Sequence, residues 1–304
     1  SWGAETPLSN FEIRLDDAMR PRQDPALTVR FALDPRPGDP GPMEMWAWTT
    51  TPWTLPANLA LAVGADLDYV VVDHDGTFVV VGAEAAMRYE RELGDARIVR
   101  HLRGAGLVGR TYTPLFDYFA GRANSFVVID ADFVGTEDGT GVVHIAPGHG
   151  EDDQRAGETA GIELVSPVDD SGRYTGEVTD FAGTNVFDAN PGVIAWLKER
   201  GWVVRHETYD HNYPHCWRTD TPIIYRAVSS WYVRVTDFRD RMVELNEGIN
   251  WIPSHVRDGQ FGKWIAGARD WSISRNRFWG APIPVWVSDD PAYPRVDVYG
   301  SLDE

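Results

Sequence analysis

The sequence predicts a mixed α+β fold that is rich in strands over its first two hundred residues and ends in a helical extension. Two observations support this class. Short β-branched runs bounded by Gly or Asp recur up to about residue 145, which is typical of strands. Helical segments with recognisable ends are fewer and lie mostly later in the chain. The 304 residues, of which 43% are hydrophobic, are enough to build a packed core.

The first predicted strand covers residues 27–31, where apolar and polar side chains alternate. A Pro/Gly-rich loop follows at residues 34–42, so we expect a pair of strands separated by this loop. Further strands are expected at residues 69–73, 77–81, 125–129 and 141–145.

Three helices are predicted from their ends. Residues 83–93 precede Gly94, and residues 236–246 precede Gly248. Residues 192–200 precede Gly201, and we expect the Asn-Pro pair at residues 190–191 to form the turn that opens this helix. Internal repeats and low-complexity tracts are absent from the sequence, which argues against a solenoid.

The net charge of −18 argues against non-specific nucleic-acid binding, because contacts with phosphates depend on Lys and Arg. The charge is unevenly distributed. Residues 1–210 hold 17 basic and 34 acidic side chains, whereas residues 211–288 hold 10 basic and 7 acidic ones. The later segment is therefore the better candidate for touching a polyanion.

The single cysteine, Cys216, excludes an internal disulfide and is too little for a cysteine-based zinc site. A lone cysteine among aromatic residues is more often buried and inert than nucleophilic. No run of about 20 apolar residues is present, and the first residues do not resemble a signal peptide. We therefore expect a cytoplasmic protein without a membrane partner.

The most unusual stretch covers residues 48–58 and contains four threonines, two tryptophans and two prolines. Such a stiff segment can present several hydroxyl groups in fixed directions, which suits binding of a sugar or a polar ester. The alternative is an ordinary strand end whose threonines serve β propensity.

A second cluster covers residues 139–153 and contains two histidines and three carboxylates. A strand ending near His144 and a helix beginning at Glu151 would bring an imidazole and a carboxylate together. Asp153 would lie in the first turn of that helix, where the dipole favours the ionised form by about 0.3–1 kcal/mol. Such an anion suits an ammonium group. The alternatives are a metal site and a buried histidine beside a helix cap.

Residues 104–109 match a dinucleotide-binding fingerprint as a string, but we reject this interpretation. The fingerprint acts only when it opens a helix, whereas strand-like residues and Pro114 follow here. A serine nucleophile of the Gly-x-Ser-x-Gly type is also missing.

Together, the threonine peptide and the second cluster resemble the editing (CP1) insertion of isoleucyl-tRNA synthetases. Valyl and leucyl relatives carry an arginine after their threonines, whereas this chain has Thr51-Pro52-Trp53-Thr54. Residues 6–12, 213–218 and 269–284 extend the resemblance over nearly the whole chain. It implies a barrel-like editing domain at residues 22–214, an N-terminal connecting ribbon at residues 1–21, and a segment at residues 215–304 that returns toward the aminoacylation domain.

The resemblance implies hydrolysis of valine mischarged onto tRNA(Ile), by a positioned water and without metal or cofactor. The catalytic positions that it assigns are Thr49, Thr50, Thr51, His144 and Asp153. The substrate-binding positions are Trp53, Thr54, Asn58, Gly139, Thr140 and Gly141. The expected partners are the 3′ end of tRNA(Ile) carrying valine and the rest of the parent synthetase in cis, with the chain itself a monomer.

Some features depart from this family or leave a choice open. The ATP-binding signatures of class I synthetases are absent from the sequence, so we do not expect amino-acid activation. His149 replaces an expected aromatic residue, Thr219 replaces a frequent cysteine, and either Tyr209 or Tyr213 is expected to line the site. Three other functions remain open: a tRNA-docking module without catalysis, a metal-dependent hydrolase using His144, His149 and Asp153, and valyl-type editing of threonine.

Overall fold

The computed structural model describes residues 1–9, 12–15, 17–274, 281–301 and 303–304. The chain divides into two units, Ser1–Ala227 and Val228–Glu304. Parts of two strings that carry the resemblance, residues 10–11 and 275–280, lie outside the described residues. In the described part of the chain, no helix is both long and apolar enough to cross a membrane.

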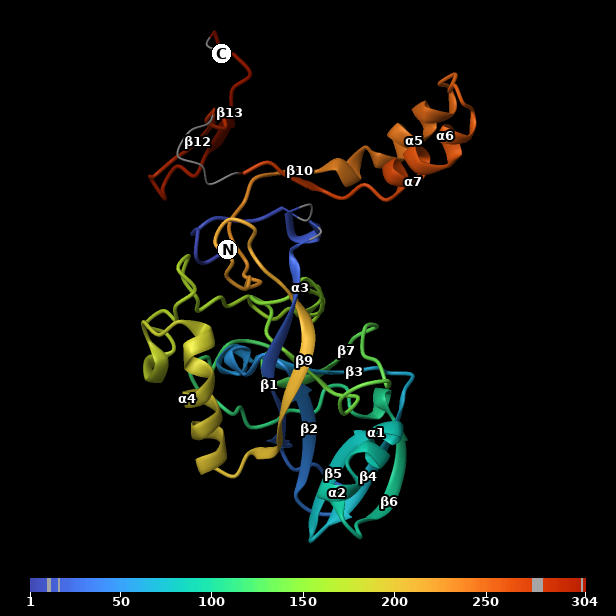
Figure 1. The fold of residues 1–304 in the computed structure, drawn as a ribbon, viewed down its shortest axis with the longest axis vertical. Coiled ribbons are helices and arrows are strands. Elements are labelled where there is room, and N and C mark those ends of the chain that lie inside the picture. The colour runs from blue at the N-terminus through green and yellow to red at the C-terminus, as the bar shows by residue number, and fades with distance from the viewer. Residues whose placement is uncertain (10–11, 16, 275–280, 302) are drawn as a thin grey trace. The chain divides into compact units, whose positions relative to one another are not determined.

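The larger sheet of the first unit has six strands in the order β6-β4-β5-β2-β1-β9. β2 and β5 run parallel, and the other neighbouring strands run antiparallel. The bounds are β1 (Met19–Ala32), β2 (Met43–Thr49), β4 (Asp68–His74), β5 (Thr77–Gly82), β6 (Arg97–Arg103) and β9 (Val203–Pro214). In Figure 1, β1 and β9 run side by side as a long ribbon that begins where Met19 pairs with Pro214.

The smaller sheet has the order β7-β3-β8 and carries one of the predicted site residues. β3 (Ala60–Val63) lies in its centre, parallel to β7 (Val127–Asp130) and antiparallel to β8 (Val143–Ile145). Alternate β3 side chains enter different cores: Leu61 and Val63 join the larger one, while Ala60 and Ala62 join the other. His144 pairs with Leu61 and is thereby held in a buried layer.

The α+β class and the predicted strands are confirmed. Residues 27–31 lie in β1, which pairs with β2 across the Pro/Gly loop, and residues 69–73 and 77–81 lie in β4 and β5. β7 and β8 begin two residues later than predicted. The reason is local, because Phe126 has φ +57° and Gly141 has φ +75°, and neither angle belongs to a strand.

The predicted helix at residues 83–93 is present as two helices, α1 (Ala83–Arg88) and α2 (Glu90–Leu93). Between them Tyr89 leaves the helical conformation, and its buried hydroxyl lies 2.7 Å from Thr28 Oγ1. Gly94 ends α2 with φ +57°, as its position in the sequence predicts. Burial of Tyr89 against the sheet therefore interrupts an otherwise helical segment.

The predicted start of the helix at residues 192–200 was wrong. The helix, α4 (Val186–Glu199), begins six residues earlier and contains Pro191. Asn185 caps it, because its Oδ1 accepts a hydrogen bond of 3.0 Å from the Phe187 N–H. Val186, Val193 and Leu197 are fully buried, so packing of the apolar face outweighs the missing N–H of proline.

In the second unit, the helices are α5 (Arg239–Glu247), α6 (His255–Asp258) and α7 (Gln260–Ala266). The strand pairs are β10 (Tyr232–Val233) with β11 (Trp271–Ser272), and β12 (Val285–Val287) with β13 (Val296–Val298). α5 begins at residue 239 rather than 236. Thr236 does not cap it, since its N–H and hydroxyl both donate to Asp270 Oδ1.

Short 3-10 helices complete the fold at Glu12–Arg14, Pro52–Ala57 (η2), Gly104–Gly106, Thr179–Phe181 and Val235–Asp237. The rejected dinucleotide string thus forms a single tight turn, and bridges at Thr111 and Tyr112 follow it. This agrees with the strand-like character predicted there.

Candidate functional site

The threonine peptide leaves the end of β2 and turns into η2. The Thr51 carbonyl accepts from the Thr54 N–H at 2.9 Å, and Pro52 occupies the first turn, where its missing N–H costs nothing. The Thr51 hydroxyl lies 3.2 Å from the hydroxyls of both Thr49 and Thr54. The turn therefore gathers three predicted hydroxyls into one cluster. Thr50 is half-buried and, among the described contacts, takes no part in it.

His144 lies against the hydroxyl cluster. Its Nε2 is 2.8 Å from Thr54 Oγ1, and its Nδ1 is 3.5 Å from Asn58 Nδ2. The side chain is only 7% exposed, and this burial, assisted by neighbouring His149, lowers the pKa of His144 to about 4. The imidazole is therefore neutral at pH 7.

Asn58 is buried behind His144 and is fully engaged. Its Nδ2 donates to the Ala60 carbonyl at 2.8 Å, and its Oδ1 accepts from the Tyr112 hydroxyl at 2.6 Å. Tyr112 was not predicted from the sequence. It lies 54 residues from Asn58 in an unremarkable strand-like stretch, so no local pattern indicates that the two side chains meet.

Asp153 lies in the first turn of α3 (Glu151–Thr159), as predicted. Its Oδ2 accepts from the Ala146 N–H at 2.9 Å, which ties the start of α3 to the chain two residues after His144. The stable anion expected from the helix dipole is opposed by burial of the side chain. Burial raises the pKa of Asp153 to about 6, and the hydrogen bond from Ala146 opposes this only in part.

The segment 139–141 packs against backbone and Trp48 rather than against the hydroxyl cluster. The Thr140 carbonyl accepts from the Gly82 N–H at 2.8 Å, and the Gly141 carbonyl accepts from the Tyr69 hydroxyl at 2.7 Å. A Cβ on Gly139, which has φ +62°, would lie 3.2 Å from Trp48 Cβ. Residues 139–141 therefore form the surface against which Trp48 packs. Their contacts with a substrate stay a prediction.

Trp53, at 3% exposure, is the second residue of η2, and its carbonyl accepts from the Tyr174 hydroxyl. Its ring meets His149 edge-on with 5.0 Å between centroids. Burial lowers the pKa of His149 to about 4, and its Nδ1 lies 3.1 Å from the Tyr225 carbonyl. His149 therefore substitutes for the expected aromatic residue as a packing partner of Trp53.

The two tyrosines left open by the sequence have different neighbours. Tyr209 meets Trp48 edge-on at 5.5 Å, next to Thr49. Tyr213 donates to the Ile223 carbonyl at 2.9 Å and contacts Phe187, which in turn contacts Trp53. Tyr209 is thus the tyrosine that reaches the threonine peptide through a single aromatic contact.

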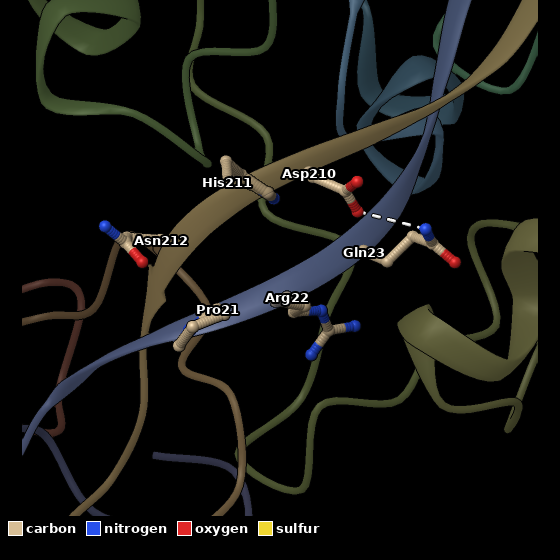
Figure 2. A pocket seen from close by; sticks show the side chains of 6 residues that line it. All are labelled: Pro21, Arg22, Gln23, Asp210, His211 and Asn212. Atoms are coloured by element: carbon tan, nitrogen blue, oxygen red, sulfur yellow. Dashed lines mark hydrogen bonds between the residues drawn. The ribbon is translucent and has the colours of Figure 1, made fainter.

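A shallow pocket of about 470 Å³ lies on the β1–β9 ribbon and is lined by Pro21, Arg22, Gln23, Asp210, His211 and Asn212 (Figure 2). Gln23 Nε2 donates to Asp210 Oδ1 at 3.0 Å across it. None of the predicted site residues lines this pocket. Among the described residues, no group of three or more His, Cys, Asp or Glu could hold a metal ion, and Cys216 is fully buried.

The arrangement combines three threonine hydroxyls, a neutral imidazole and a half-buried carboxylate. Hydroxyls and an imidazole N–H can orient ester and ribose oxygens, and the carboxylate can bind a cation. This set suits binding and orienting a charged ester better than covalent catalysis, because the one hydroxyl that meets the imidazole, that of Thr54, is itself buried.

The chain is 56% and 58% identical over its whole length to isoleucine–tRNA ligases of Rickettsia felis and Rickettsia canadensis, of which it spans 29% and 28%. A solved editing domain of the P. knowlesi cytosolic leucyl-tRNA synthetase has a TM-score of 0.47 and 10% identity, over 63% of this chain and 97% of that chain. The family model for tRNA synthetases class I (I, L, M and V) matches residues 1–298. The chain therefore belongs to the class I tRNA synthetases.

Proposed function

We propose that this chain is the editing module of an isoleucyl-tRNA synthetase and hydrolyses the ester that links valine to tRNA(Ile). The observation that carries the proposal is the joint placement of the threonine hydroxyls and His144, with Asp153 tied to the same strand end. The high identity to isoleucine–tRNA ligases supports the choice of tRNA. The rest of the parent synthetase is then its partner in cis, and the chain acts as a monomer.

A separate hydrolytic site answers a physical problem. One methylene in an apolar pocket is worth only about 1–3 kcal/mol, and isoleucyl-tRNA synthetase choosing isoleucine over valine is the known example of this limit. A second site that admits only the smaller side chain removes the errors. His144 is buried and held on two sides, so it is suited to act as the rigid wall that excludes the extra methylene of isoleucine.

Asp153 binds the α-ammonium of the esterified valine in this proposal. A bound ammonium favours the ionised carboxylate and offsets the burial that raises the pKa of Asp153. Thr49, Thr50 and Thr51 hold the terminal adenosine and the ester, while Trp53 and Thr54 form the floor. Asn58 supports His144, and the segment 139–141 shapes the wall beside Trp48.

The reaction is direct hydrolysis. A water oxygen attacks the ester carbonyl carbon, the bond between that carbon and the ribose oxygen breaks, and the proton passes to the ribose oxygen. The vicinal ribose hydroxyl assists by donating to the leaving oxygen. Threonine hydroxyls stabilise the charge that develops on the carbonyl oxygen, so positioning and electrostatics supply the rate.

Deacylation assays test the proposal. The 304-residue chain is given valyl- and isoleucyl-tRNA(Ile) and threonyl-tRNA(Val), each with and without chelator. We expect chelator-resistant cleavage of the valyl ester. Asp153→Ala abolishes it, whereas Asp152→Ala, a matched change of an exposed carboxylate in the same helical turn, retains it.

Four other outcomes of these assays would each contradict one part of the proposal. Full activity of Asp153→Ala removes the ammonium anchor, and loss of activity with chelator favours a metal-dependent hydrolase. Preference for the threonyl ester favours valyl-type editing. A chain that binds tRNA and cleaves none of the esters is a docking module.

A further inference from the structure

A chain of hydrogen bonds runs through His144 with a fixed direction. It joins Tyr112, Asn58, His144 and Thr54 and ends on the carbonyl of Thr51. The Thr51 carbonyl at one end can only accept, and near the other end the acceptor-only carbonyl of Ala60 orients Asn58. The position of the single imidazole proton can therefore be worked out from both sides.

The Asn58 end determines which group faces Nδ1. The Ala60 carbonyl can only accept, so the Asn58 atom 2.8 Å away is the amide nitrogen. The Tyr112 hydroxyl, 2.6 Å from the other amide atom, therefore donates to Oδ1. The second amide N–H then has two acceptors at 3.5 Å, the Ile145 carbonyl and His144 Nδ1. A proton on Nδ1 would face this amide donor, so the contact favours a ring nitrogen without a proton.

The Thr54 end gives the same answer independently. Its hydroxyl has one hydrogen, which goes to the acceptor-only carbonyl of Thr51 at 2.8 Å. His144 Nε2, 2.8 Å from the same oxygen, must then donate. Burial that lowers the pKa of His144 to about 4 leaves one proton on the ring at neutral pH, in agreement with both ends.

We propose that Tyr112 and Asn58 are positioning residues that lock His144 as the Nε2–H tautomer and so fix the hydroxyl of Thr54. This inference rests on the proposed function and names residues that govern its selectivity. In the opposite tautomer the Thr54 hydrogen would turn to Nε2, and the Thr51 carbonyl would keep the Thr54 N–H but lose the second of its two donors. His144 is thus a wall and a donor, and not the base that activates water.

The fixed tautomer leaves the hydroxyls of Thr49 and Thr51 available to donate to a substrate. Thr49 Oγ1 already accepts from the Thr51 N–H at 3.1 Å, so the hydrogen of Thr49 is directed either at the Thr51 hydroxyl or at a bound oxygen. The Thr54 hydroxyl is therefore fixed, whereas Thr49, which is equally buried, and half-buried Thr51 can donate their hydroxyl hydrogens to an ester oxygen without breaking the bonds to His144.

The tautomer is measurable without substrate. Imidazole nitrogen NMR spectra of the 304-residue chain, labelled with ¹⁵N-histidine, are recorded at neutral pH, and His144→Gln identifies the His144 signals. We expect a protonated Nε2 and an unprotonated Nδ1. In Asn58→Asp the proton moves to Nδ1, because a carboxylate oxygen now faces it. A wild-type His144 that is protonated on Nδ1, or on both nitrogens, overturns the inference.

The role of Tyr112 is tested by comparing two phenylalanine variants. Tyr112→Phe leaves the Asn58 oxygen without its donor, so both tautomers of His144 should appear. Selectivity for the valyl over the isoleucyl ester should fall at least about tenfold, since misplacing a site group by 1 Å can cost about 10²-fold. Tyr89→Phe is the matched control, because both tyrosines are 2% exposed and the Tyr89 hydroxyl bonds to Thr28, in a different core cluster from Tyr112.

The control should keep the Nε2–H tautomer and the selectivity. If Tyr112→Phe matches Tyr89→Phe in its spectrum, Tyr112 does not position His144. A wild-type chain with the expected tautomer and no deacylation contradicts the proposed function alone, whereas a wrong tautomer in an active chain contradicts this inference alone.

Discussion

Asp153 is a residue whose burial opposes its charge. Its pKa is raised from 3.8 to about 6, so the folded protein binds this proton more tightly than the unfolded chain does. Stability from this group is therefore lost as the pH rises through 6. We expect Asp153→Asn, which keeps the acceptor for Ala146, to unfold at higher urea concentration at pH 7, with a gain of about 1–3 kcal/mol.

This gain should shrink as the pH falls and vanish below about pH 3, where the wild-type group is protonated in both states. An equal gain at pH 7 and pH 4 would mean that packing, not charge, causes it. A charge-dependent gain would show that ionised Asp153 destabilises the fold at pH 7.

The same carboxyl predicts the pH dependence of activity. The free protein must ionise Asp153 before it can bind an ammonium group, so kcat/KM for the valyl ester should fall about tenfold per pH unit below about 6. Asp152→Ala should keep the fall in acid but shift it to lower pH, because the charge of Asp152 helps to raise the pKa of Asp153. A profile that is flat between pH 5 and 7 would contradict the assignment of Asp153 as the anchor.

His149 should make the fold sensitive to acid. Its pKa is lowered from 6.5 to about 4 by burial and by Arg226, and it faces Trp53 and the Tyr225 carbonyl. Stability from this group is present above pH 6.5 and is lost as the pH falls toward 4. Between pH 7 and 5 the wild type should therefore lose about 2 kcal/mol more than His149→Phe. Urea unfolding at the two pH values measures this difference, and equal losses would refute it.

At the scale of elements, the contribution of the α4 cap to the free energy of unfolding can be measured. Asn185 is buried and accepts from the Phe187 N–H, so Asn185→Ala should lower the free energy of unfolding by about 1 kcal/mol. Asp188→Ala, which removes an exposed charge in the same turn, should cost only a few tenths of a kcal/mol. Equal effects of the two variants would show that the cap bond does not set the start of the helix.

The strands were more predictable than the helix boundaries. Valine-rich runs such as those of β4 and β5 can be recognised from the sequence alone. Both faces of these strands pack into hydrophobic cores, so nearly every position of the runs is apolar. Boundaries depend on tertiary contacts that no local pattern contains. Tyr89 breaks a helix because its hydroxyl meets Thr28, and Pro191 is tolerated because the helix around it is buried.

At the scale of the whole molecule, the extent of the site-bearing unit is testable. The expected domain ends at residue 214, whereas the compact unit is Ser1–Ala227. Residues after 214 supply the Tyr225 carbonyl to His149, the Ile223 carbonyl to Tyr213, and the Ala227 N–H to Gly148. We expect a chain of residues 1–227 to keep the urea midpoint of the site-bearing unit and a chain of residues 1–214 to lose it. Equal midpoints would place the boundary at 214.

The two segments that form the site could be predicted from the sequence, but the hydrogen bonds between their side chains could not. The clustering of threonines and the carboxylate after His144 are visible in the sequence. That Thr54 and His144 are in contact depends on β3 pairing with β8 and on the turn at η2. Tyr112 and the raised pKa of Asp153 depend on packing alone, and these are the features that the sequence did not predict.

The most direct test of the central claim, that His144 is the wall of a deacylation pocket, is the ratio of valyl- to isoleucyl-tRNA(Ile) cleavage by His144→Ala and by the wild type. The wild type should cleave the valyl ester and spare the isoleucyl ester. The variant should cleave both, because the removed ring leaves room for the extra methylene. A His144→Ala chain that still cleaves the valyl ester and still spares the isoleucyl ester would contradict the account.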